Sequence, residues 1–86
     1  MITAQQDYAA WAGLVTELSE AQEHLAALIE SMVKEGCVED ADFAVQLGHV
    51  FAHLNRAWNS RNQTEEISEA QWERYSDFPK DLKPVG

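Results

Sequence analysis

The sequence has little of what small proteins often use to hold a fold together. Cys37 is the only cysteine among the 86 residues, so no disulfide can form within the chain. A lone cysteine is weakly typical of a reducing compartment. Prolines occur only at positions 79 and 84, so the rest of the chain is free to form uninterrupted helices. A chain of this length buries a modest core and often depends on a second copy or a metal for stability.

Long apolar runs are absent as well. No run in the sequence approaches the ~20 residues of a membrane-spanning helix. The N-terminus has no basic segment followed by an apolar stretch, so we expect no signal peptide. Together these absences predict a cytoplasmic protein that does not insert into a membrane.

Basic residues are scarce, with 6 against 15 acidic residues and a net charge of −9. Direct binding of nucleic acid or of an anionic membrane surface is therefore not expected, because both need a basic surface. The acid is unevenly spread. Residues 1–35 hold six acids and one base, for −5, and residues 36–62 hold three acids and two bases, for −1. This distribution is compatible with a basic protein partner. It is also compatible with acidic residues whose only role is to keep a small domain soluble.

The central stretch, residues 40–61, has the periodicity of an amphipathic helix. Its apolar residues recur at spacings of three and four, which places them on one helical face: Phe43, Leu47, Val50, Leu54 and Ala57. A second apolar row, Ala44, Phe51 and Trp58, lies beside the first. The combined face is wider than contact with a single helix requires, so the second row is our candidate dimer or core face.

The stretch before it, residues 4–34, predicts a longer helix. Thr3 and Gln6 have the spacing of a capping box at its start. A heptad seam of alternating three- and four-residue steps follows: Tyr8, Trp11, Val15, Leu18, Gln22, Leu25, Ile29 and Met32. Leu14, Ala21 and Leu28 widen this seam on one flank. The seam is longer than the second helix can cover.

Turn and cap signals fix the connections. Gly36 suits the left-handed position after the first helix, and Asp40 suits the N-cap of the second. Ser68 and Gln71 form a second capping box, which predicts a short third helix over residues 69–76. Phe78 and Pro79 end that helix, because the residue before proline is pushed out of helical geometry. An extended C-terminal tail follows.

These elements predict one all-α domain over residues 1–86. Its first two helices, about 4–34 and 40–61, would form an antiparallel hairpin because their connection is short. The third helix and the tail would close one end. The width of the apolar faces predicts that two hairpins pair as a homodimer in a four-helix bundle.

Three histidines and one glutamate are candidate metal ligands. An antiparallel hairpin folded near residue 37 would bring Glu20, His24, His49 and His53 to one depth. Nitrogen and carboxylate ligands from facing helices are what a metal site in a helical bundle needs. However, neither E-x-x-H nor H-E-x-x-H occurs, and His49 and His24 lie off the apolar seam. On these grounds we expect no cofactor and no metal.

Glu20, Glu23 and Glu30 form an acidic row on the first helix, and this row is our candidate partner-binding surface. Cys37 lies among acidic residues that oppose thiolate formation, so we expect no catalytic role for it. No catalytic constellation is present. The sequence therefore favours a non-enzymatic interaction or regulatory protein, an inhibitor or adaptor of a larger, possibly basic partner. The alternative is a metal- or ligand-binding bundle protein or enzyme subunit that uses His24, His49 and His53.

Overall fold

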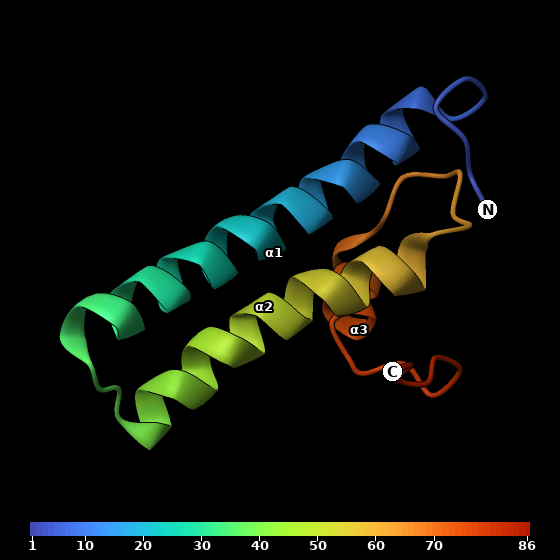
Figure 1. Ribbon diagram of the computed structural model, residues 1–86. Helices are drawn as coiled ribbons and strands as arrows, with labels where there is room; N and C mark the ends of the chain where they lie inside the picture. Colours follow the sequence, from blue (N-terminus) through green and yellow to red (C-terminus); the bar gives the residue numbers. More distant parts are fainter.

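The molecule is built from three helices and contains no β-strand, as the computed structural model of all 86 residues shows. α1 spans Tyr8–Glu35, α2 spans Asp40–Ser60 and α3 spans Glu69–Tyr75. α1 and α2 run antiparallel side by side, and α3 lies against the C-terminal half of α2 (Figure 1). The predicted all-α class is confirmed. No helix combines the length and the apolar character that crossing a membrane requires.

The ends of the first helix differ in how well they were predicted. Gly36 takes the left-handed conformation, with φ of 69°, as expected for a residue that ends a helix. At the other end α1 begins at Tyr8, and the prediction of residue 4 is wrong. The Thr3 hydroxyl does accept a hydrogen bond from the Gln6 N–H at 3.2 Å, but it closes a separate turn. The Ile2 N–H donates to the Arg61 carbonyl at 3.1 Å, which ties this segment to the end of α2.

The two long helices contact each other along a row beside the heptad seam. On α1 the buried apolar residues are Leu14, Ala21 and Leu28, and on α2 they are Val50 and Ala57. These are the flank residues of α1, and the seam itself points elsewhere. Most of its apolar side chains stay well exposed, from Met32 at 37% to Ile29 at 53%, with Tyr8 still more exposed. The periodicity therefore identified the helix correctly but not the face that packs against α2.

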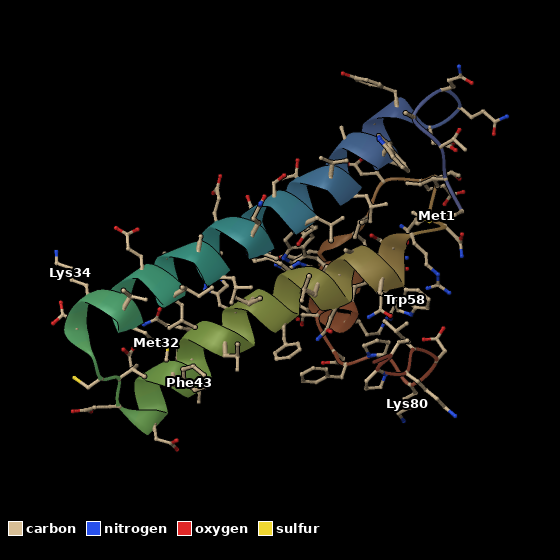
Figure 2. All side chains as sticks on the ribbon, viewed as in Figure 1. Met1, Met32, Lys34, Phe43, Trp58 and Lys80 are labelled. Carbon is tan, nitrogen blue, oxygen red and sulfur yellow. The ribbon has the colours of Figure 1, made fainter.

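One side of the hairpin is consequently apolar and uncovered. Each seam residue of α1 follows a residue of the row that contacts α2, so at about 100° per residue the seam is turned roughly a quarter turn away from that contact. Leu54 likewise follows His53 of the contact row of α2. Because the two helices are antiparallel, both rotations bring these side chains to the same side of the hairpin. We call the resulting surface the open apolar face. Its members are 37% to 53% exposed: Val15, Leu18, Leu25, Ile29, Met32 and Leu54. Met32 lies near the closed end, with Phe43 of α2 close to it (Figure 2).

Two asparagines of α2 attach the third helix. The buried Asn55 side chain donates to the Ser76 carbonyl at 2.8 Å, and Asn59 donates to the carbonyls of Tyr75 and Asp77 at 2.8 and 3.1 Å. These carbonyls are at the C-terminal end of α3, where a helix leaves acceptors without internal partners. At the other end, Ser68 and Gln71 make the predicted capping box.

The tail packs on the second apolar row of α2. The Trp58 indole N–H donates to Asp81 at 2.9 Å, and the Arg61 guanidinium lies 3.6 Å from the centre of a Trp58 ring. The Phe51 ring lies 5.1 Å from that of Phe78. Two members of this candidate dimer or core row are thus in contact with the chain's own tail, and only Ala44 remains without such a contact. Leu54 of the open apolar face lines a groove together with Phe78 and Leu82 of the tail.

Candidate functional site

A buried carboxylate marks the most unusual place in the molecule. Glu17 lies on the contact face of α1, between Leu14 and Ala21, and is only 6% exposed. Acidic side chains are almost never buried to this extent unless they are paired. Both Glu17 carboxylate oxygens lie 3.2 Å from Nε of Arg56, and Oε2 lies 2.8 Å from Nδ1 of His53. His53 is 5% exposed, so this contact takes place away from water.

The proton on His53 can be assigned from its neighbours. Nδ1 lies 2.8 Å from a Glu17 oxygen and 3.1 Å from an Arg56 guanidinium nitrogen. Arginine can only donate, and Glu17 as a carboxylate can only accept, so Nδ1 cannot bond to both. The shorter contact, to a carboxylate that Arg56 also holds, assigns the proton to Nδ1, which donates to Glu17. The lone pair of a neutral His53 then resides on Nε2.

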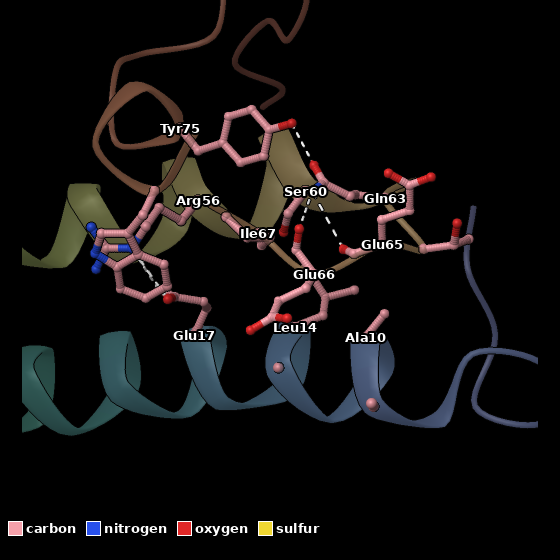
Figure 3. Close-up of a pocket in the computed structure, with 14 residues that line it drawn as sticks. Ala10, Leu14, Glu17, Arg56, Ser60, Gln63, Glu65, Glu66, Ile67 and Tyr75 are labelled. Atoms are coloured by element: carbon pink, nitrogen blue, oxygen red, sulfur yellow. Dashed lines mark hydrogen bonds and ion pairs between the residues drawn. The ribbon is translucent and has the colours of Figure 1, made fainter. Parts of the chain in front are cut away.

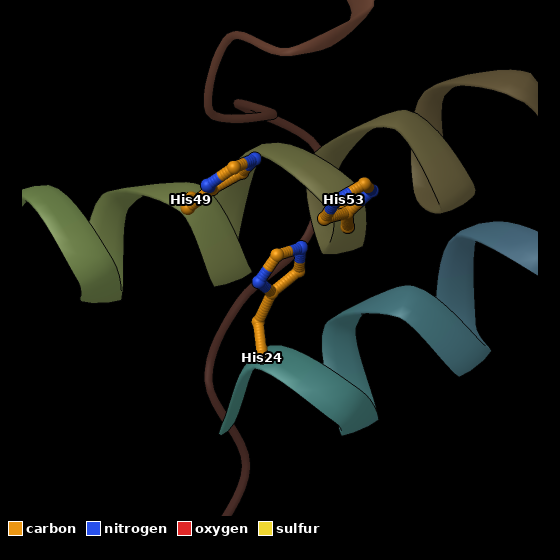
Figure 4. A group of neighbouring side chains, drawn as sticks. All are labelled: His24, His49 and His53. Atoms are coloured by element: carbon orange, nitrogen blue, oxygen red, sulfur yellow. The ribbon is translucent and has the colours of Figure 1, made fainter. Parts of the chain in front are cut away.

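The three histidines come together as one stack between the helices (Figure 4). Ring centroids are 4.3 Å apart for His24 and His49, 5.3 Å for His24 and His53, and 5.4 Å for His49 and His53. Each ring offers a nitrogen within 4.8 Å of the others. Glu20 joins the group through an oxygen 3.4 Å from His53 Nδ1. The antiparallel register thus gathers the four residues that the sequence singled out.

The sequence reasoning missed Glu17 and Arg56 at this site. The signal for Glu17 was present, since it lies three residues after Leu14 and four before Ala21, in an otherwise apolar row. A charged residue in such a row needs a partner on the facing helix. Arg56 supplies it, and its guanidinium also packs over the Trp72 ring at 4.2 Å.

A cavity of about 440 Å³ borders the same site (Figure 3). Its walls come from all three helices and from the connection before α3: Glu17 and Leu14 of α1, Arg56 and Ser60 of α2, and Trp72 and Tyr75 of α3. The Tyr75 hydroxyl donates to Gln63 across the cavity rim. Glu17 therefore both lines the cavity and holds His53.

The other predicted site residues lie apart from this cluster. Glu23 and Glu30 are exposed on α1, and neither makes a side-chain hydrogen bond or ion pair. Cys37 is free and exposed in the hairpin turn. The tryptophans are dispersed: Trp11 packs against the small core of Ile2, Leu14 and Ala57, whereas Trp58 contacts Arg61 and Trp72 contacts Arg56.

No protein-family model, no curated protein and no solved structure matches this chain.

Proposed function

We propose that this chain is a non-enzymatic interaction protein that works as a homodimer joined through the open apolar face. The observation that carries the proposal is the exposure of the α1 heptad seam, where Leu18 and Ile29 are 48% and 53% exposed. A seam held over more than three heptads is typical of helices that pack against another helix. Within the chain α2 leaves it uncovered.

The area of the open apolar face fits a second copy. The six aliphatic and thioether side chains of the open apolar face, each 37% to 53% exposed, present apolar surface on the order of 400–500 Å² per chain. A standard interface takes about 800 Å² from each partner, and in homodimers about 65% of it is apolar, which is about 520 Å². A two-fold pairing of this face with itself would place four long helices around one core, as in a four-helix bundle.

The small internal core supports the same reading. Only six hydrophobic residues of the 86 are buried, and no side chain is completely sealed from water. A second copy packed on the open face would add the missing core. The cavity and the histidine stack flank the other side of the α1–α2 contact, so they would stay accessible in such a dimer.

Charge substitutions on the face test the proposal. The double variant Leu18→Glu with Ile29→Glu should be monomeric, because burying four carboxylates in a dimer core is strongly unfavourable. It should keep its helical circular dichroism, since both side chains are half exposed in the single chain. Val45→Glu is the matched control: Val45 is 71% exposed on α2 but outside the open face, so the variant should dimerise like wild type. Equal molar masses for the double variant and wild type in light scattering would contradict the proposal.

The exposed acids of α1 supply the second part of the proposed role, a docking surface for a basic partner. Glu23 and Glu30 support it because neither is used in an intramolecular contact. Glu20 differs from these two acids, because its carboxylate also contacts His53 within the chain. Glu23→Gln with Glu30→Gln should slow association with a co-purified partner at low salt and leave folding unchanged, because long-range attraction mainly accelerates encounter. An unchanged association rate at low and at high salt would remove this part of the proposal.

A further inference from the structure

From the histidine stack we infer a divalent metal site formed by His24, His49 and His53, with Glu17 as the group that orients His53. The site would take zinc or another late first-row transition ion, because imidazole nitrogen suits these ions and hard cations such as Mg²⁺ prefer oxygen. This inference is independent of the proposed dimer.

The spacing of the rings is close to what one ion needs. At metal–nitrogen distances of 2.0–2.1 Å, two ligands of a tetrahedral ion lie about 3.3 Å apart. The three rings offer nitrogens within 4.8 Å of one another but are stacked nearly parallel, so His24 and His49 have to approach His53 by about 1.5 Å and turn a nitrogen toward the ion. His24 and His49 are exposed and can turn, whereas His53 is buried and fixed. Two adjustable ligands would therefore close on one fixed ligand.

The surroundings of His53 favour a ligand role over a merely structural one. Histidines that ligate metals usually donate their other ring N–H to a carboxylate, which sets the tautomer and the ring orientation. The Glu17 contact of 2.8 Å to Nδ1 provides this arrangement and leaves Nε2 free to bind an ion. Arg56 fixes Glu17 in turn through both carboxylate oxygens.

Glu20 is not the fourth ligand in this geometry. Its oxygen lies 3.4 Å from Nδ1 of His53, the nitrogen that already faces Glu17, so it is a second acceptor on the same side of the ring. The fourth position of a tetrahedral ion would then be open to water. Three protein ligands with an open position are typical of zinc sites that bind an exchangeable ligand.

Zinc chloride titrated into untagged protein by calorimetry tests the site. We expect one zinc per chain with micromolar or tighter affinity, and no competition from excess Mg²⁺. His24→Ala and His49→Ala should each weaken binding at least tenfold, and both should fold because the two side chains are exposed. Glu35→Gln is the matched control, since it removes an exposed acid of α1 but no ligand, and it should bind zinc like wild type.

Two further readouts separate this site from other causes of zinc binding. Nitrogen NMR of the zinc-loaded protein should show His53 protonated at Nδ1 and bound through Nε2. Glu17→Gln, if folded by circular dichroism, should weaken zinc binding by about 10–100-fold, as losses of such orienting groups do. The monomeric Leu18→Glu/Ile29→Glu variant should still bind one zinc per chain. Absent binding, wild-type affinity in both histidine variants, or zinc bound without His53 would each overturn the inference.

Discussion

At the scale of single residues, Asp81 holds the C-terminal tail on α2. The hydrogen bond from the Trp58 indole lowers the pKa of Asp81 below its ordinary value, and Arg61 beside it adds to this effect. A lowered folded-state pKa means that the interaction contributes stability above the unfolded pKa of about 4 and loses it as the pH falls through the folded value. The carboxylate side chain is 67% exposed, so its contribution to global stability is small and its effect is local to the tail.

Acid should therefore release the tail from Trp58. We expect tryptophan emission to shift as the pH is lowered below about 4, where an ordinary aspartate begins to protonate. Asp81→Asn should lack this component, because its side chain carries no charge to titrate. Asp77→Asn should retain it, since only the backbone carbonyl of Asp77 contacts Asn59. If Asp81→Asn and wild type give superimposable pH profiles, the tail is not held by this carboxylate.

At the scale of elements, sequence periodicity located the helices better than it located their partners. The predicted starts of α2 and α3 match the structure, and their ends are within a residue. The capping box of α3 is confirmed, whereas the predicted N-cap Asp40 of α2 is wrong: the N-cap is Glu39, and its side chain makes no capping hydrogen bond. The phase of α1 was wrong for a physical reason. The heptad seam of α1 and the row beside it are both apolar, so either could pack against α2. The row that does so contains Glu17, which pairs with Arg56 and His53 of α2. The face that α1 turns toward α2 is therefore linked to contacts between residues that lie 36 and 39 positions apart in the chain, which local periodicity does not reveal.

The same limit applies to the site. The register that brings His24 to His49 followed from the short turn, so the cluster could be predicted. The tautomer of His53 depends on Glu17, and the attachment of α3 depends on Asn55 and Asn59. The sequence around a polar residue on an amphipathic helix does not indicate which distant carbonyl or ring its side chain will contact.

Asn55 should control the docking of α3. Asn55→Ala leaves the partly buried Ser76 carbonyl without its donor, at a cost of about 1 kcal/mol. Because α3 has no buried residue of its own, we expect the helix to detach while α1 and α2 remain paired. Hydrogen exchange should then quicken for amides of residues 69–75 and change little in α1. Asn62→Ala, at an exposed position, is the control. Equal exchange in both variants would mean that other contacts hold α3.

At the scale of the whole molecule, the hairpin has two different sides. Glu17 is buried in the contact between α1 and α2; the histidine stack and the cavity border that contact on one side, and the open apolar face lies on the other. The elongated shape, 45 × 30 × 24 Å, gives the open face most of the length of α1. A dimer through this face would leave two copies of the histidine site facing away from the interface. Assembly and metal binding would thus use separate surfaces of one short chain.

The molar mass in solution tests the central claim most directly. Each chain has a mass of 9.7 kDa, and sedimentation equilibrium over a wide concentration range distinguishes one chain from two. We predict a mass that rises toward twice 9.7 kDa with concentration, and a melting temperature that rises with it, because association stabilises the folded chain. A mass of one chain at every concentration, together with a cooperative melt, would contradict the account: the small internal core would then suffice, and the open apolar face would not join two copies.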